Sequence, residues 1–355
     1  MLVSEHKMNW KSLLKITYNY AKKIFSGTKK SQTNVDNKNN VLIISNNFTG
    51  GGLEHRINNI VNKFSYKYNF SLITKTPAKS MKTRPSASII KIYKWTDYKK
   101  ALKNADIIDV HPWKISKIYK KWGLFTKKNI TKKIYTLHGE ASLNEDLHFL
   151  QYVDRVYCVG DSLIKAIKCK YPNVKDIHLL KNYDSISCNN NFSNESNNIL
   201  FSITNLSDIN FIQEIINTIP EQYTIHIIGN IDSSVISKNN KHIIFHGFVN
   251  LTDFFRQYKF TAAFSRGSFA SQDIIAKDIP CFLISSNKYG FYLECLTRDN
   301  FVKLSDNNFV TREPFNKKYL ITQLSKINPD FKKYLCSDLL IAHNDISLLE
   351  DPYDF

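Results

Sequence analysis

Short apolar runs alternate with segments of helical period along most of the chain. The first run, residues 41–45, carries no charge, as expected of a strand that is buried on both faces. It leads through a polar turn into Gly50, Gly51 and Gly52, after which apolar residues recur at helical spacing up to residue 64. The pattern therefore predicts a strand, a glycine turn and a helix.

The same alternation continues in two series that a polar segment separates. The first series predicts strands at residues 70–74, 88–93, 107–111, 133–137, 155–159 and 177–180, with helices at 97–103 and 162–170. Residues 184–198 are almost entirely polar and are predicted to be an interdomain linker. The second series predicts strands at 199–203, 224–229, 242–245, 261–264 and 280–284, with helices at 209–219, 251–258 and 271–277. Two α/β domains follow, each a parallel sheet with helices on both faces.

The N-terminal segment has a different character. Residues 9–25 place Trp10 and several aliphatic residues on one helical face, with lysines largely off that face. Such a basic amphipathic helix is typical of a segment that lies in a membrane surface, although an extra helix docked on the domain would show the same stripe. Residues 26–40 have little apolar content and are predicted to be a flexible tether.

Polar residues stand at the carboxyl ends of three predicted strands. These are His111, His138 and Asn182, and open α/β sheets bind ligands at this edge. A single histidine there is more often structural than catalytic, but three polar residues at one edge favour a ligand site. The glycine turn adds backbone N–H groups that suit an anion, although it lacks the spacing of a dinucleotide-binding or P-loop motif. A plain tight connection between strand and helix would need the same glycines.

Composition narrows the class of protein. The 355 residues are 43% hydrophobic, which suffices for two packed cores. The six cysteines form neither a C-x-x-C pair nor a zinc-type cluster and are expected to be reduced, mostly buried thiols of a cytoplasmic protein. The sequence shows no apolar stretch of about 20 residues and no signal peptide, so we expect neither a spanning nor a secreted protein.

The net charge of +18 is unevenly placed, because residues 1–133 carry +22 and the remainder −4. A basic half of this size attracts an anionic membrane, a nucleic acid or an anionic glycan, although a solvated lysine-rich surface explains part of it. The positive charges are mostly lysines and no nucleic-acid-binding signature is visible, so we expect no nucleic-acid partner. We favour peripheral contact with the cytoplasmic face of an anionic membrane.

A series of short motifs in a fixed order resembles the GT-B glycosyltransferases, and among them the large retaining group that uses nucleotide sugars. Gly51-Gly52-Leu53-Glu54 matches the Gly-Gly-x-Glu loop of that group, and His138-Gly139 matches its strand-end histidine. The other matching segments are residues 159–162, 179–184, 225–229, 246–249 and 273–280. The resemblance covers about residues 41–285.

The resemblance implies two Rossmann-like domains that face each other across a cleft: an acceptor domain at 41–183 and a nucleotide-sugar domain at 199–335. The N-terminal segment 1–40 precedes them, the linker 184–198 joins them, and the tail 336–355 is expected to cross back. The implied activity is metal-independent hexosyl transfer from a nucleotide sugar, expected to be a UDP-sugar, to a glycan or lipid-linked acceptor. Such a reaction serves cell-surface polysaccharide or glycolipid synthesis. A catalytically inactive GT-B subunit that binds an acceptor or a partner enzyme is the alternative.

Site roles follow from the same resemblance. His138 and Asp273 are the expected catalytic residues, His138 to contact the sugar or accept a proton and Asp273 to orient a hydroxyl. Glu54 and His111 are expected to contact the acceptor. The expected donor-binding residues are Gly50, Gly51, Gly52, Gly247, Phe248, Arg266, Gly267 and Ser268, and no metal site or other cofactor is expected.

Two departures from the family pattern concern the diphosphate and the sugar. Residues 204–210 lack the usual Arg and Lys, so Arg266 is the predicted replacement cation because a guanidinium pairs well with phosphate. The family's paired glutamates are altered as well. Asp273 takes the second position, while the first falls on Ser265, or on Ser268 if the loop is shortened, and neither serine can act as a carboxylate.

Overall fold

The structure is a computed structural model of the full chain. It describes residues 38–46, 48, 52–76, 85–111, 122–124, 131–139, 143, 146–186, 188, 192–193, 196–203, 209–229, 234, 236, 242–249, 251–287, 289–327 and 330–354, without the side chains of Thr252 and Ser268. The predicted helix at 9–25 lies outside these residues, as do Gly50, Gly51 and the stretch 204–208. The described residues from Asn39 onward belong to one compact unit.

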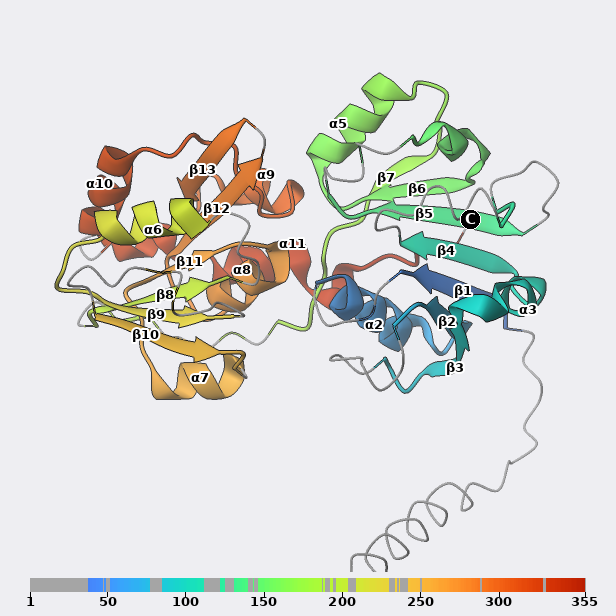
Figure 1. Ribbon diagram of the computed structural model, residues 1–355, viewed down its shortest axis with the longest axis horizontal. Coiled ribbons are helices and arrows are strands. Elements are labelled where there is room, and N and C mark those ends of the chain that lie inside the picture. Colours follow the sequence, from blue (N-terminus) through green and yellow to red (C-terminus); the bar gives the residue numbers. More distant parts are fainter. Residues whose placement is uncertain are drawn as a thin grey trace, which may run out of the picture. The chain divides into compact units, whose positions relative to one another are not determined.

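The first sheet has seven parallel strands in the order β3-β2-β1-β4-β5-β6-β7. Its strands are β1 (Asn40–Ser45), β2 (Asn69–Thr74), β3 (Ile89–Lys94), β4 (Ile107–His111), β5 (Lys132–Leu137), β6 (Arg155–Cys158) and β7 (Ile177–Leu179). The order reverses direction beside β1, as it does in doubly wound sheets (Figure 1). The parallel sheet predicted from the first series of apolar runs is therefore confirmed.

Strand β1 shows why this sheet needs helices on both faces. Leu42 and Ile44 enter one apolar core, while Val41 and Ile43 enter another on the opposite face. The first core is covered by α3 (Tyr98–Lys103) and α5 (Asp161–Lys170), and the second by α2 (Gly52–Phe64). Short 3-10 helices at Trp95–Asp97 and His148–Tyr152 lie between these elements along the chain.

The second sheet has six strands in the order β10-β9-β8-β11-β12-β13. They are β8 (Asn198–Ser202), β9 (Thr224–Ile228), β10 (His242–Gly247), β11 (Ala262–Ser265), β12 (Cys281–Asn287) and β13 (Gly290–Cys295). Helices α6 (Ile209–Thr218) and α10 (Lys317–Ile327) cover one face, and α7 (Leu251–Gln257), α8 (Ser268–Ile275), α9 (Phe301–Asp306) and α11 (Ser337–Asn344) cover the other. Both predicted α/β domains are thus present (Figure 1).

Two features of this sheet differ from the sequence-based prediction. Strand β13 pairs antiparallel with β12, and the apolar pattern did not reveal it because its residues alternate between buried and exposed only weakly. Helix α8 begins at Ser268, three residues earlier than predicted, because Gly267 adopts a φ of 107° and turns the chain directly into the helix. Asp278 also has a positive φ, of 55°.

The C-terminal segment lies against the first sheet. After α11, a 3-10 helix (Ile346–Leu348) leads to Leu349 and Tyr353, which are buried in the same core as α2. A second short 3-10 helix, Phe331–Tyr334, lies between α10 and α11 along the chain. In Figure 1 the red C-terminal segment runs from α11 to the first sheet.

The cysteines are unpaired, and most of them lie in the cores. All six cysteines are free thiols; Cys158, Cys281, Cys295 and Cys336 are buried, whereas Cys169 is exposed. The expectation of mostly buried, reduced thiols is confirmed. Within the described ranges, helices that combine the length and the apolar character needed to cross a bilayer are absent.

Candidate functional site

The predicted ligand edge of the first sheet brings two histidines into contact. His111 ends β4 and His138 follows β5, and Nδ1 of His111 lies 2.8 Å from Nε2 of His138. His111 is only 1% exposed, whereas His138 is half-buried. The pair therefore presents His138 toward the edge and keeps His111 behind it.

The surroundings of this pair keep His138 uncharged. Burial lowers the pKa of His138 well below its usual value, and the nearby His111 and Arg56 lower it further. A neutral imidazole has one N–H donor and one basic nitrogen, so it can both donate to and accept from hydroxyl groups. His138 has the protonation state that a hydrogen-bonding partner or proton acceptor needs.

Arg56, on the second turn of α2, is a buried cation that the sequence interpretation missed. It is 2% exposed and donates through Nη1 to Oδ1 of Asn182 at 2.9 Å and through Nη2 to the carbonyl of Leu180 at 2.8 Å. Burial lowers its pKa to about 10, while the nearby Asp109 favours the charged form. Arg56 remains charged at neutral pH and fixes α2 to the end of the first sheet.

Asn182, the third predicted strand-end residue, connects several elements. Its Oδ1 accepts from Arg56, and its Nδ2 donates to Oδ1 of Asn308 at 2.8 Å. Its main-chain carbonyl accepts from Nε2 of Gln272 in α8 at 2.6 Å. Its side chain is 9% exposed. Asn182 therefore acts as a structural connector between the two α/β domains rather than as an open ligand contact.

The start of α2 meets the start of α8. Gly52 is the first residue of α2, and a Cβ atom placed on it would come within 3.1 Å of the Phe269 ring. The His55 ring packs edge-on against the same Phe269, with 4.7 Å between ring centroids. The first turns of α2 and α8 thus adjoin, whereas Gly50 and Gly51 lie outside the described residues.

Asp273 lies in a charged cluster next to this contact. His55 Nε2 is 2.8 Å from Oδ2 of Asp184, and this hydrogen bond raises the pKa of His55. Burial alone would raise the pKa of Asp184, but the hydrogen bond and charge of His55, together with hydrogen bonds from Ser185 and Asn59, outweigh burial and lower it. Burial and the Asp184 charge instead raise the pKa of Asp273 to about 6. Asp273 therefore titrates just below neutral pH.

A small cavity borders this cluster. It has a volume of about 140 Å³ and is lined by residues from the linker, α7 and α8, among them Asp184, Asp273 and Lys277. Sites for drug-sized ligands usually measure roughly 300–1,000 Å³. The cavity is too small for a whole nucleotide sugar, and the role predicted for Asp273 in orienting a hydroxyl stays a prediction.

The edge of the second sheet carries the other predicted donor contacts. Arg266 follows β11 and is half-buried, and its Nη2 donates to Oγ of Ser286 at 3.0 Å. Ser265, at the position of a family glutamate, is 1% exposed and accepts a hydrogen bond from Oγ of Ser271 at 3.1 Å. The side chain of Ser268 lies outside the described residues. Arg266 therefore lies at the carboxyl end of β11, its predicted contact with a phosphate stays a prediction, and Ser265 is closed off in the helix packing.

Gly247 ends β10, and Phe248 follows it in the turn. Gly247 has a φ of 65°, and Phe248 is 67% exposed. Behind the turn, His246 Nε2 lies 3.0 Å from Nδ1 of His226, and the two rings stack. Burial and the neighbouring histidines lower the pKa of His226 to about 4. The histidine pair is neutral and supports a turn whose aromatic side chain is open to solvent.

Two further predicted residues lie inside the fold. Glu54 is 5% exposed within α2, and His111 reaches the edge only through His138. Their predicted contact with an acceptor stays a prediction. Among the described residues, a cluster of three or more His, Cys, Asp or Glu side chains that could hold a metal ion is not found.

Comparison with solved structures identifies the architecture. The apo form of the lipopolysaccharide outer core galactosyltransferase WaaB matches with a TM-score of 0.55 and 14% identity, over 86% of this chain and 99% of that protein. Anabaena HepE in complex with UDP and glucose matches with a TM-score of 0.62 and 9% identity, over 87% and 96%. An α-glucosyltransferase in complex with UDP and a 13-mer DNA matches with a TM-score of 0.57 and 13% identity, over 88% and 97%.

These likenesses show that the chain has the GT-B fold, as the sequence predicted. No protein-family model matches the sequence, and no curated protein matches it significantly. Identities of 9–14% show the fold alone, because one fold hosts many reactions.

The raised pKa of Asp273 predicts a pH-dependent cost in stability. A carboxyl group whose folded pKa is about 6 instead of 3.8 stabilises the fold only while protonated, and this contribution is lost as the pH rises through 6. Asp273→Asn should therefore raise the free energy of unfolding at pH 7.5 by about 1–2 kcal/mol, and the gain should shrink toward pH 4.5. Urea denaturation at both pH values measures this. The exposed Asp253→Asn is the control, and a gain for Asp273→Asn that does not depend on pH would contradict the prediction.

The contact between Gly52 and Phe269 predicts a second, independent effect. Gly52→Ala should destabilise the fold by about 1 kcal/mol, because the added methyl group crowds the Phe269 ring. In the Phe269→Ala background the same change should cost nothing, which a double-mutant cycle of unfolding free energies measures. Gly139→Ala, where a Cβ meets no atom within 4 Å, is the matched control. Equal costs of Gly52→Ala in both backgrounds would show that these two residues do not touch.

Proposed function

We propose that this chain is a glycosyltransferase that moves a hexose from a nucleotide sugar, specifically a UDP-sugar, to a glycan or lipid-linked acceptor. The product would belong to a cell-surface polysaccharide or glycolipid. The GT-B fold and the solved complexes of similar proteins with UDP support this class of reaction.

The observation that carries the proposal is the contact between the first turns of α2 and α8. Gly52 and His55 touch Phe269, which lies three residues beyond Arg266. A diphosphate at this junction would meet backbone N–H groups at the start of α2 from one side and the Arg266 guanidinium from the other. Fixed donors from two domains are what a departing diphosphate requires.

In the proposed reaction, His138 at the edge of the first sheet and Asp273 beside the second sheet have separate roles. Transfer breaks the bond between the anomeric carbon and a diphosphate oxygen and forms a bond from that carbon to an acceptor oxygen, while the acceptor hydroxyl loses its proton. His138 would accept a hydrogen bond from a hydroxyl of the sugar or acceptor, since it is uncharged and half-buried. Asp273 would orient a donor hydroxyl as an ionised carboxylate above about pH 6. We propose that the reaction needs no resident metal ion.

A catalytically inactive GT-B subunit is the second candidate. The closed position of Ser265 favours it, because a serine that is buried and bonded to Ser271 cannot replace a carboxylate at the sugar. An inactive subunit would bind an acceptor or a partner enzyme without consuming the donor. Turnover of a panel of UDP-sugars, measured by release of UDP, distinguishes the two candidates.

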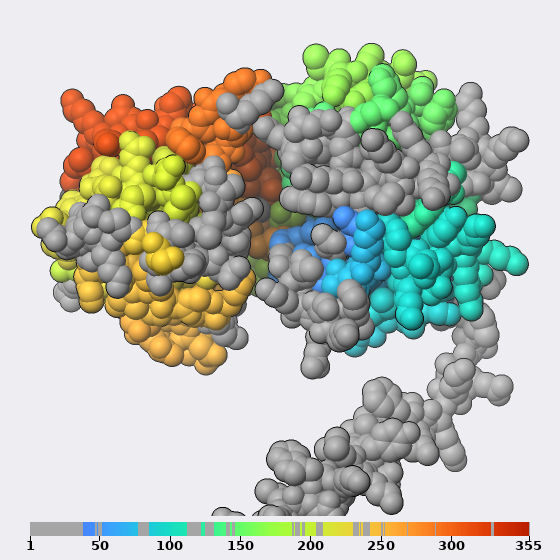
Figure 2. Space-filling model, viewed as in Figure 1, coloured from blue at the N-terminus to red at the C-terminus, as the bar shows by residue number. Residues whose placement is uncertain are grey.

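We also propose that the first domain binds an anionic membrane through its basic surface. The edge strand β3 exposes Ile90 and Ile92, which are 67% and 43% exposed, and Lys94 shares their face. The neighbouring helix α3 adds the exposed Lys99, Lys100 and Lys103. In Figure 2 these cyan elements lie open at the surface. Lysines on an edge strand also discourage pairing with other chains, but exposed isoleucines beside them are typical of a membrane interface.

The role of Arg266 predicts a loss of donor affinity on mutation. Arg266→Ala should weaken binding of UDP by about 10- to 100-fold, because a charge-assisted hydrogen bond contributes roughly 1.5–3 kcal/mol. Isothermal titration calorimetry of the full chain measures this. Arg256→Ala, which removes an exposed arginine of the same domain, is the control and should bind UDP normally. If Arg266→Ala also binds normally, the phosphate assignment is wrong.

The basic surface predicts binding to anionic vesicles. The full chain should sediment with vesicles that contain phosphatidylserine at physiological salt and not with neutral vesicles. Each lysine near such a surface contributes about 1 kcal/mol, so Lys99→Glu with Lys103→Glu should weaken binding at least about tenfold.

Lys165→Glu with Lys168→Glu, on the exposed side of α5, is the matched control and should bind as the wild type does. The same proteins are tested with duplex DNA at the same salt. Binding to DNA without binding to vesicles would overturn the membrane assignment and would identify a nucleic acid as the partner of the basic surface.

A further inference from the structure

We propose that Tyr353, in the C-terminal segment, is a positioning residue that sets the hydrogen-bonding direction of His138 through Asp109 and His111. The inference concerns the site of the proposed transferase and rests on that proposed function for its catalytic meaning. Its physical basis, a series of contacts that joins residues 244 positions apart in the sequence, is independent of the reaction.

The series begins inside the first sheet. The hydroxyl of Tyr353 donates to Oδ2 of Asp109 at 2.9 Å, and the hydroxyl of Thr136 lies 3.5 Å from Oδ1. Tyr353 and Asp109 are each 2% exposed. Both oxygens of Asp109 face hydroxyl donors and the Arg56 charge is nearby, so Asp109 serves as a hydrogen-bond acceptor on both sides. Burial and the Asp109 charge raise the pKa of Tyr353, so its hydroxyl remains a donor.

Asp109 in turn selects the tautomer of His111. Oδ2 of Asp109 lies 3.2 Å from Nε2 of His111, in a geometry too bent for a regular hydrogen bond. A lone pair on Nε2 would repel the carboxylate at this distance, whereas an N–H is attracted to it. Nε2 of His111 therefore carries the proton, and its Nδ1 is left as an acceptor.

His138 completes the series. Since Nδ1 of His111 accepts, Nε2 of His138 donates across the 2.8 Å contact. The remaining nitrogen of His138, Nδ1, is then unprotonated and basic. Without the Asp109 contact, either histidine could donate to the other, and Nδ1 of His138 would be basic in only part of the molecules. The C-terminal segment thus determines which nitrogen of His138 can accept a proton or a hydrogen bond.

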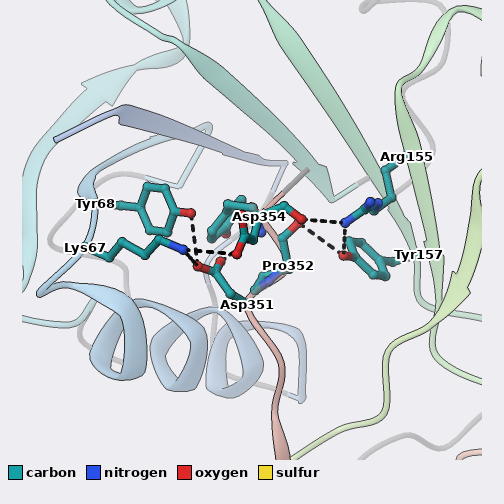
Figure 3. Close-up of polar contacts among 8 residues, drawn as sticks. Lys67, Tyr68, Arg155, Tyr157, Asp351, Pro352 and Asp354 are labelled. Atoms are coloured by element: carbon teal, nitrogen blue, oxygen red, sulfur yellow. Dashed lines mark hydrogen bonds and ion pairs between the residues drawn. The ribbon is translucent and has the colours of Figure 1, made fainter.

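Other contacts hold the C-terminal segment in place and supply a matched control. Lys67 and the hydroxyl of Tyr68 bind Oδ2 of Asp351 at 2.7 and 3.0 Å, and the hydroxyl of Tyr157 donates to the carbonyl of Pro352 at 3.1 Å (Figure 3). These contacts touch the same segment but not Asp109. Removing the Tyr68 hydroxyl therefore removes one contact of the segment without breaking the series.

The test measures the histidine tautomers directly. Full-length protein labelled with ¹⁵N-histidine is studied by long-range ¹H–¹⁵N correlation at pH 8, with resonances assigned from His111→Gln and His138→Gln. In the wild type, both His111 and His138 should be protonated on Nε2. Tyr353→Phe should lower the Nε2–H fraction of both rings, while Tyr68→Phe should leave them as in the wild type.

Unchanged tautomers in Tyr353→Phe would overturn the inference, as would an equal change in Tyr68→Phe. Should Tyr353→Phe fail to fold, Asp109→Asn provides the same comparison for His111. UDP-sugar turnover is measured alongside: Tyr353→Phe should lower kcat about tenfold with the donor KM unchanged, and Tyr68→Phe should lower neither. Absence of turnover in the wild type would refute the proposed function, whereas the tautomer result would still decide the role of Tyr353.

Discussion

The burial of Arg56 is the constraint on which the arrangement of both domains depends. A buried guanidinium is costly unless most of its donors are paired and its charge is balanced. Asn182 and the Leu180 carbonyl accept hydrogen bonds from Nη1 and Nη2, Asp109 provides a nearby negative charge, and Nε is buried without a hydrogen-bond partner among the described residues. Helix α2 must therefore dock at the end of the first sheet. Through Asn182, which also bonds Gln272 and Asn308, the same requirement extends to α8 and to the turn after α9.

Arg56 also explains why two histidines can share one sheet edge. Its charge helps to keep His138 neutral, and the negative charge of Asp109 compensates Arg56 in the same core. Two imidazolium ions 2.8 Å apart would repel strongly, so the contact requires at least one neutral ring, and burial keeps His138 neutral. Helix α2 thus contributes two features, the contact of Gly52 with Phe269 at its start and Arg56 on its second turn, which lies near the histidine pair.

The parallel strands and the linker between the two series could be predicted from the sequence, because apolar periodicity and strand-end polarity are local signals. His111 and His138 were placed at the ligand edge for the same reason. Arg56, Asp109 and Tyr353 could not be found, because nothing near each residue reveals a partner 50 to 300 positions away. Strand β13 was missed since a weakly alternating edge strand resembles a loop. Glu54, which the resemblance assigns to the acceptor, is buried by helix packing, and its predicted contact stays a prediction.

Ser265 cannot supply a negative charge, so in the proposed reaction the negative charge that is needed near the sugar must come from other residues. A glycosyl transition state carries positive charge on the sugar and negative charge on the diphosphate, so both need fixed partners. In the second domain Arg266 can serve the diphosphate, but the serine at 265 is committed to Ser271. In the proposed reaction, negative charge near the sugar would come from Asp273 and, by way of two neutral imidazoles, from Asp109. Under this proposal His138 is polarised through the buried series, and the C-terminal segment that anchors the series contributes to the site.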